Sequence, residues 1–218
     1  MMRKGEVHTA PVTGILLKDV AEGQIVKVNE NGFPVEFYVA KHDYESALNG
    51  IGRTLLVRKE TIGAFVWNSN GKSTYADSDI NKKLNETYYN KFSDNCKSLI
   101  DTTKFYYTIG NGDKTIATLS RHIFLLSVNE NGGDNISSGN FNIEGQTLPI
   151  YALLYSAVQF WTRTPDIRTD FASYAYFMQA NGGWNASPTI NNKQVRPCFT
   201  LPSNALFDKT TMLLKGVK

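Results

Sequence analysis

The sequence predicts a single α+β domain with mixed, mainly antiparallel sheets and one or two helices. The chain has 218 residues, 41% of them apolar, enough for one substantial core and close to the largest size that one core usually serves. Apolar residues alternate with period two near both ends of the chain, which indicates strands. Between these regions the apolar period rises to about four residues, which indicates a helix.

The first predicted element is a hairpin within residues 25–40. Apolar residues at 25, 26 and 28 precede an Asn-Gly turn, and residues 35, 37 and 39 alternate with polar ones after it. A third strand is expected at 55–57, leading through Ile62 and Phe65 to Trp67.

A helix is predicted to start near residue 77. Its apolar stripe consists of residues four apart, namely Ile80, Leu84, Tyr88 and Phe92. Ser78 or Asp77 is the expected N-cap. A second short helix is expected from 94 to 100.

Strands are expected again in the rest of the chain, at 105–107, 123–126, 172–178 and 195–201, with a turn at 181–183. We expect 161–165 and 195–201 to be adjacent core-forming strands, because each has bulky residues next to a proline that can end a strand or occupy an edge. The predicted organisation is an N-terminal arm (1–19), the domain (20–205) and a C-terminal tail (206–218).

Composition argues against several classes of protein. The net charge is only +3, and Lys and Arg are scattered, so nothing favours nucleic acid as a partner. The N-terminus lacks the apolar run of a signal peptide, and the longest apolar stretch, 148–161, is short and contains polar residues. We therefore expect a soluble protein made in the cytoplasm. The two cysteines, Cys96 and Cys198, are expected as reduced thiols.

No residue pattern indicates catalysis or a metal site. The three histidines are isolated from one another and from any nucleophile, and no phosphate loop, nucleophile elbow or dinucleotide fingerprint occurs. Oxygen-bearing residues at 129–135 are interpreted as a solvated turn, and Asp77 and Asp79 as part of a helix start. The pentapeptide Val-Asn-Glu-Asn-Gly occurs at 28–32 and 128–132 and is interpreted as two similar turns. We expect no catalytic residues, cofactor or metal.

The segment 166–194 is the predicted binding surface. Tyr, Trp, Arg and Asn are favoured at binding surfaces, because rigid aromatics supply area and short polar groups supply hydrogen bonds. Tyr174 and Tyr176 should share one face of a strand and be exposed together. The alternative is that the aromatics of this segment belong partly to the core. The candidate residues are Arg168, Tyr174, Tyr176, Gln179, Trp184, Asn185, Asn191 and Asn192.

Several segments in this order resemble a domain family of unknown function common in phages, prophages and gut bacteria. They are PVEFYV at 34–39, TLLVRK at 54–59, YADSDI at 75–80 followed by Leu84-Asn85, IFLLS at 123–127 followed by Glu130, WTRTP at 161–165 and VRPCFTL at 195–201. The resemblance implies a C-type-lectin-like fold, related to the formylglycine-generating enzymes and to the variable proteins of diversity-generating retroelements. It also implies that C-terminal strands and loops carry the ligand-binding surface.

The sequence lacks the motifs that carry calcium binding and catalysis in these relatives. Calcium-dependent lectins typically carry a Trp-Asn-Asp element, whereas Trp184-Asn185 is followed here by Ala186. The cysteine pair of the formylglycine-generating enzymes cannot be mapped onto Cys96 and Cys198. We therefore expect neither calcium-dependent sugar binding nor that oxidase activity.

The function expected from the resemblance is that of a structural or decorating protein of a bacteriophage particle, associated with capsid, neck or tail. Its partners would be other virion proteins, and it would recur in symmetric copies as a homo-oligomer. The alternative is a receptor-binding or adhesive module for a host protein or glycan. An enzyme of the formylglycine-generating type is the third possibility.

Overall fold

The structure is a computed structural model and describes residues 14–134, 139–155 and 157–217. Within these residues the strands form four sheets, paired mainly antiparallel, and the helical segments are short. The predicted α+β class is therefore confirmed. The shorter helical segments are η1 (Leu17–Asp19), α1 (Ser46–Asn49), η2 (Tyr75–Asp77), η5 (Tyr151–Leu154) and η6 (Thr169–Phe171).

A four-stranded antiparallel sheet contains the predicted hairpin. Its order is β12-β4-β3-β2, and the strands are β2 (Ile25–Glu30), β3 (Phe33–Lys41), β4 (Arg53–Arg58) and β12 (Cys198–Pro202). Glu30 pairs with Phe33, which leaves a two-residue loop. Both loop residues are left-handed, with φ of 50° at Asn31 and 84° at Gly32, as a tight hairpin requires. The hairpin and the third predicted strand are confirmed.

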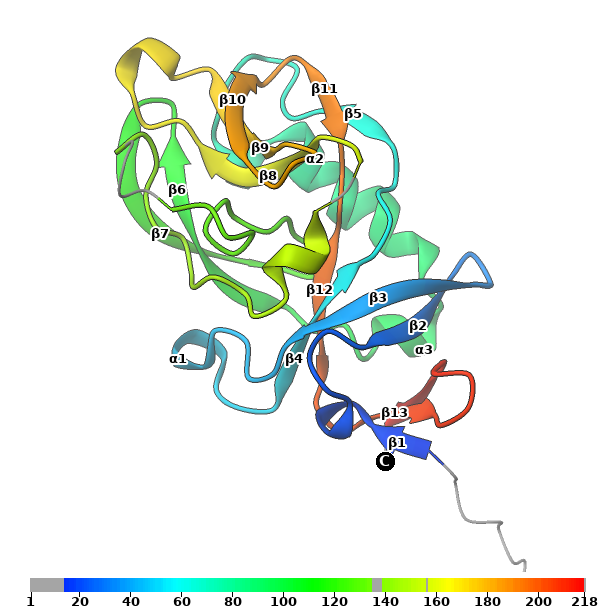
Figure 1. The fold of residues 1–218 in the computed structure, drawn as a ribbon. Coiled ribbons are helices and arrows are strands. Elements are labelled where there is room, and N and C mark those ends of the chain that lie inside the picture. The colour runs from blue at the N-terminus through cyan, green and yellow to red at the C-terminus, as the bar shows by residue number, and fades with distance from the viewer. Residues whose placement is uncertain (1–13, 135–138, 156, 218) are drawn as a thin grey trace, which may run out of the picture.

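A five-stranded sheet contains most of the C-terminal strands. Its order is β10-β9-β8-β11-β5, and the strands are β5 (Ala64–Val66), β8 (Phe160–Pro165), β9 (Tyr174–Met178), β10 (Trp184–Pro188) and β11 (Asn192–Gln194). The expectation that 161–165 and 195–201 are adjacent strands is wrong, because β8 and β12 belong to different sheets. The chain crosses between the sheets after β11, whose Gln194 pairs with Phe160 of β8. Figure 1 shows the strands of the four-stranded and five-stranded sheets as two groups. β12 runs into the group that contains β3 and β4.

The predicted helix is confirmed as one continuous helical stretch. It consists of α2 (Asp79–Lys82), η3 (Lys83–Tyr88) and η4 (Tyr89–Lys91). Ser78 is the cap, since its hydroxyl accepts a hydrogen bond from the Asn81 backbone at 3.2 Å. All four residues of the predicted apolar stripe are buried. The second helix is α3 (Asp94–Lys97), shorter than expected.

The segment 123–126 is buried as predicted but is not part of a sheet. It makes one isolated bridge, between Phe124 and Cys198. Side chains satisfy the backbone of Leu125 instead: the Tyr75 hydroxyl pairs with its N–H at 3.0 Å, and Arg163 donates to its carbonyl at 2.9 Å. These side chains thus use the N–H and carbonyl of Leu125 that would otherwise pair with a neighbouring strand.

Residues 105–107 lie in β6 (Thr103–Gly110), which pairs with β7 (Asp113–Arg121) in a separate two-stranded sheet. The sequence analysis did not predict β7. Its residues are mostly exposed, so the strand lacks the apolar alternation that a half-buried strand shows.

The two ends of the described chain meet in a third sheet. β1 (Gly14–Leu16), β13 (Ala205–Asp208) and β14 (Leu214–Val217) pair in the order β1-β13-β14. Leu17 and Phe207 are fully buried and belong to the main core. The described parts of the expected arm and tail are therefore packed against the domain rather than extending from it.

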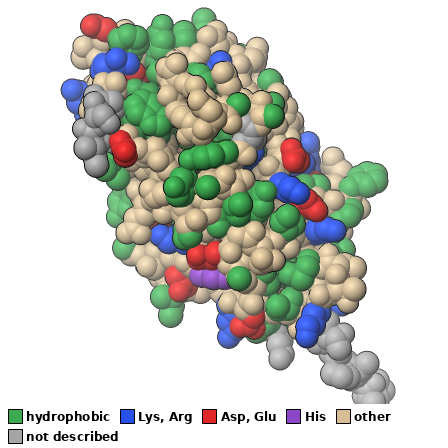
Figure 2. All heavy atoms as spheres, viewed as in Figure 1, with side chains coloured by type: hydrophobic (Ala, Val, Ile, Leu, Met, Phe, Trp, Pro, Cys, Tyr) green, Lys and Arg blue, Asp and Glu red, His purple; other side chains and the backbone are tan. Residues whose placement is uncertain are grey.

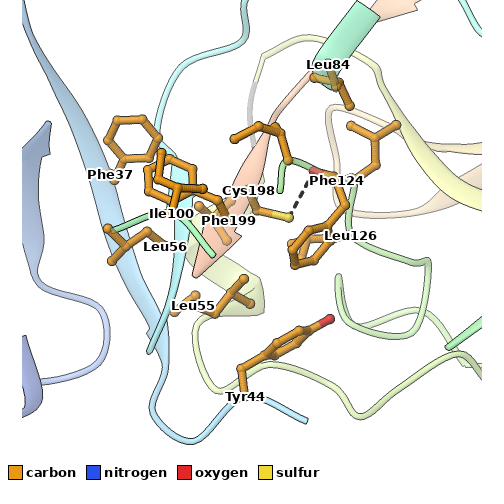
Figure 3. Packing of buried hydrophobic residues seen from close by; sticks show 14 of the residues in the cluster. Phe37, Tyr44, Leu55, Leu56, Leu84, Ile100, Phe124, Leu126, Cys198 and Phe199 are labelled. Carbon is orange, nitrogen blue, oxygen red and sulfur yellow. Dashed lines mark hydrogen bonds between the residues drawn. The ribbon is translucent and has the colours of Figure 1, made fainter. Parts of the chain in front are cut away.

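The main core lies where β3, β4 and β12 meet the helical stretch. Figure 3 shows Phe37 of β3 and Leu56 of β4 beside Ile100 and Phe199, and Cys198 of β12 beside Phe124. The Cys198 thiol donates to the Phe124 carbonyl at 3.1 Å. Both cysteines are free and buried, and burial raises the pKa of Cys96 to about 12 and that of Cys198 well above its ordinary value.

Candidate functional site

The predicted binding surface is only partly a surface. Asn185, Asn191 and Asn192 are exposed, whereas Arg168, Tyr174, Gln179 and Trp184 are half-buried and Tyr176 is buried. The expectation that Tyr174 and Tyr176 are exposed together is wrong. Phe141, from a loop distant in sequence, packs on the Tyr176 ring with centroids 5.0 Å apart, while Tyr174 packs on Phe171.

Arg168 is held in place by its neighbours. Its guanidinium pairs with Asp166 through Nε at 3.0 Å and Nη2 at 2.6 Å, and lies 3.9 Å from the centre of the Phe171 ring. Tyr176 also donates to Asp166, at 3.2 Å. Asp166 thus connects Tyr176 of β9 to the loop that precedes this strand. Arg168 is part of this connection and is also half-exposed at the surface.

An exposed apolar surface lies beside the predicted one, on η5 and the residues that follow it. We call it the η5 surface and define it as Tyr151, Leu153, Tyr155 and Val158, which are 37%, 49%, 38% and 39% exposed. η5 is the yellow-green helix at the centre of Figure 1. Figure 2, viewed from the same side, shows apolar side chains gathered there. The sequence analysis considered this stretch only as a membrane segment and missed it.

Close contacts with glycines hold the η5 surface in place. The Tyr155 ring lies on Gly182, and the Tyr151 ring lies on Gly132; a Cβ at either glycine would come within 2.4 Å of the ring. Gly133, next in the chain, contacts the Trp184 ring in the same way. The η5 surface is therefore continuous with the turn that carries Trp184, and the two form one face.

Beneath this face lies a buried charge cluster that consists of Arg163, Glu130, Glu144 and Tyr44, none more than 1% exposed. Arg163 Nη1 donates to Glu130 Oε2 at 2.5 Å, and the Tyr44 hydroxyl donates to Glu130 Oε1 at 2.5 Å. Glu144 accepts from the Thr108 backbone and the Thr164 hydroxyl. Burial raises the pKa of Glu144, and the nearby carboxylates raise that of Arg163 despite its burial.

The segment 129–132 is a turn, as interpreted, but the expectation that it is solvated is wrong. Asn129, Glu130 and Asn131 are at most 4% exposed. The reason is Arg163, which brings an unscreened positive charge into the core and requires a carboxylate beside it. Asp134 is exposed, and Asn135 lies outside the described residues.

The repeated pentapeptide places its glutamate in similar surroundings twice. Glu30 is 6% exposed and accepts hydrogen bonds from Arg58 and from the Tyr88 hydroxyl. Glu130 likewise accepts from an arginine and a tyrosine. The backbones differ, since 28–30 are in a strand and 128–130 are not. The same pentapeptide therefore adopts two conformations, and in each of them its glutamate pairs with an arginine and a tyrosine.

The described histidines contact neighbouring groups, and both cysteines are buried. Among the described residues, no three His, Cys, Asp or Glu side chains gather as metal ligands. The His42 ring contacts Thr54 and the Val20 carbonyl, and His122 contacts the Ile100 carbonyl. In this same part of the chain, no helix has both the length and the apolar character needed to cross a membrane.

The fold and site define an α+β domain with a buried charge cluster and an exposed apolar surface. A family model described as a domain of unknown function, DUF6273, matches residues 51–203, and the chain belongs to this family. The match contains Glu130, Glu144, Arg163 and the η5 surface, whereas Tyr44 and the hairpin precede it. No curated protein and no solved structure matches the chain.

Proposed function

We propose that this chain is a non-catalytic binding module that serves as a structural or decorating protein of a bacteriophage particle. The observation that carries the binding role is the η5 surface. Its four apolar side chains are between 37% and 49% exposed, and its tyrosines pack on Gly132 and on Gly182 of the turn before Trp184. Contiguous exposed apolar side chains favour contact with another protein.

The construction of this surface suits protein binding. The Tyr151 and Tyr155 rings contact each other edge to face with centroids 6.0 Å apart, and each is seated on a glycine. Aromatic side chains that are already fixed lose little conformational entropy when a partner binds. The occupant that we propose is an apolar patch of another virion protein.

The interior supports a non-catalytic role. The ion pair of Arg163 and Glu130 is enclosed, and both thiols are buried with raised pKa values. A raised pKa keeps a thiol protonated and therefore unreactive as a nucleophile. The virion setting rests on the family resemblance in the sequence, as does the finer proposal of a C-type-lectin-like fold, with which the mainly antiparallel sheets agree.

The test of the virion role is mass spectrometry of purified particles. We expect the chain in a fixed copy number per particle, as symmetric assembly requires. Its absence from particles that carry their other structural proteins would overturn the virion role.

The test of the binding role compares variants within the same particles. Leu153→Ala and Tyr155→Ala should each lower incorporation at limiting concentration by about 10-fold or more, as anchor residues do. Ile51→Ala, at a side chain that is 85% exposed and outside the η5 surface, is the matched control. Parental incorporation of both surface variants, once each is shown to be folded, would place the contact elsewhere.

A host glycan is the second candidate partner. Asn185, Asn191 and Asn192 are exposed near the ends of β10 and β11, where their amides offer both donors and acceptors to sugar hydroxyls. An Asn185, Asn191 and Asn192 triple alanine variant that assembles normally but no longer adsorbs to host cells would favour this role.

A further inference from the structure

A cleft on the surface lies between α1, the loop around Gly145 and the β6–β7 hairpin. It consists of two hollows of about 340 and 350 Å³ that share Glu45, Ala47 and Gln146 in their linings. We call it the Glu45 cleft. It is separate from the residues of the η5 surface, so an inference about it is independent of the proposed function.

The carboxylate of Glu45 is the charged group that the two hollows share. It is half-buried, and no described residue donates a hydrogen bond to it, although ionised carboxylates are strong acceptors. Lys41, which lines one of the two hollows, instead donates to Gln146 Oε1 at 3.1 Å. Glu45 therefore offers a desolvated carboxylate with free acceptor capacity to whatever enters the cleft.

Gly145 allows Glu45 to approach the buried charge cluster. It has a φ of +97°, and the position that its Cβ would occupy lies 3.0 Å from both Glu45 Oε1 and Glu130 Oε1. Any side chain here would push the two carboxylates apart. Glu130 already has Arg163 and Tyr44 as partners, which leaves Glu45 as the unpaired negative group at the cleft.

One of the two hollows is mainly apolar, whereas the other is lined by Lys41, His42, Asp43 and Ser46 besides the shared residues. Ile143 and Ile116 line the apolar hollow and are 58% and 46% exposed, although Ile116 lies on a strand whose other residues are mostly polar. Tyr106 and Ala47 complete this wall. Apolar walls that lead to an unpaired carboxylate are complementary to an aliphatic chain that ends in a cation.

We propose that the Glu45 cleft binds an arginine side chain of a protein partner, with its methylene groups on Ile116 and Ile143 and its guanidinium on the Glu45 carboxylate. Arginine fits better than lysine for two reasons. A guanidinium is more weakly hydrated than an ammonium and so loses less on entering a half-buried site, and its planar fork matches both carboxylate oxygens and stacks on an aromatic ring such as Tyr106.

The experiment titrates N-acetyl-arginine amide into the full chain and follows the methyl NMR signals of Ile116 and Ile143. We expect saturable shifts with a Kd on the order of millimolar, as for a fragment of this size. N-acetyl-norleucine amide, with a similar stem and no charge, should give no saturable shift. Equal binding of the two probes, or shifts confined to other methyl groups, would overturn the proposal.

Two variants locate the contact. Glu45→Gln keeps the side-chain shape and should weaken binding about 10-fold or more, whereas Glu86→Gln, at an exposed glutamate of η3, should leave Kd unchanged. Ile143→Ser leaves the carboxylate in place and should also weaken binding. Unchanged affinity in Glu45→Gln would refute the assigned charge contact.

Two further probes distinguish an arginine from a lysine side chain, and a protein partner from a free amino acid. N-acetyl-lysine amide should bind more weakly than the arginine probe, and equal affinity would contradict the choice of arginine. Free arginine should bind no more tightly than the capped probe, because the proposed contacts use the side chain alone. Free arginine binding about 10-fold tighter than the capped probe would contradict a protein partner and indicate a metabolite site.

Discussion

Arg163 is the residue on which the interior charge balance depends. It lies on β8 with no exposed surface, pairs with Glu130, and donates to the carbonyls of Tyr106, Leu125 and Glu144. These contacts tie β8 to β6 and to two loops. A buried ion pair of this kind contributes little compared with apolar packing, but the loss of one partner leaves a charge stranded in the core.

We therefore expect Arg163→Met to lower the free energy of unfolding by about 3–5 kcal/mol, because Glu130 would keep its burial and lose its cation. Urea unfolding monitored by fluorescence measures this. The comparison is Asp101→Asn, which breaks an ion pair whose aspartate is 66% exposed and should cost less than about 1 kcal/mol. Equal effects of the two substitutions would contradict the role assigned to Arg163.

Glu45 should make stability depend on pH. Burial, and next the charge of Glu130, raise its pKa, while Arg163 and Lys41 oppose the shift. A carboxyl whose pKa is raised in the folded state contributes stability below its unfolded pKa of about 4.3, and this contribution is lost as pH rises through the folded value.

Glu45→Gln removes this titration. The variant should therefore be more stable than the parent at pH 7, and the difference should shrink as the pH falls to 4. Chemical denaturation of both proteins across this range measures the difference, with Glu86→Gln as the control. A difference that grows toward acid pH would show that Glu45 is stabilised, not destabilised, by its charge.

At the scale of elements, β8 connects the five-stranded sheet to the main core. All its residues are buried. The Trp161 ring packs against Phe177, and its Nε1 donates to the Phe65 carbonyl at 2.9 Å. This contact reaches β5, which is not the strand that the sequence analysis expected beside it.

Trp161→Ala should lower the free energy of unfolding by about 3–5 kcal/mol, the usual cost of removing a buried large aromatic. Trp161→Phe should cost less, because it keeps most of the apolar contact and loses the hydrogen bond. Thermal and urea unfolding of the two variants test this. An unchanged melting temperature for Trp161→Ala would contradict its place in the core.

At the scale of the whole molecule, the matched family region is not a complete sheet. β4 lies between β3 and β12, but the match begins at residue 51, after β3 has ended. β13 also lies beyond the match, although Phe207 is fully buried. The segments on either side of the match therefore cover apolar surface of the matched region.

A fragment of residues 51–203 should therefore fail to unfold cooperatively. Without the hairpin, β4 loses a partner strand and the apolar contacts of Phe37, and Glu130 loses Tyr44. Circular dichroism during thermal unfolding, with the full chain as reference, tests this. A cooperative transition of the fragment near the midpoint of the full chain would show that the flanking strands are dispensable.

The sequence by itself determined the elements whose signals are local. The hairpin at 25–40 follows from alternation and an Asn-Gly turn, and the helical stretch after Ser78 follows from a cap and a four-residue apolar stripe. In each case the residues that decide the conformation are neighbours in sequence, so their spacing contains the information. The mostly exposed β7 has no such pattern and was missed.

Only the tertiary structure decided which polar and aromatic residues are buried. Glu130 bonds to Arg163, 33 positions away, and to Tyr44, 86 positions away, and Phe141 covers Tyr176 from another loop. Alternation states that a side chain lies on one face of a strand, but not what packs on that face. The Glu45 cleft is likewise formed by residues that are far apart in the chain, and the tyrosines of the η5 surface pack on Gly132 and Gly182, which are distant from them in sequence.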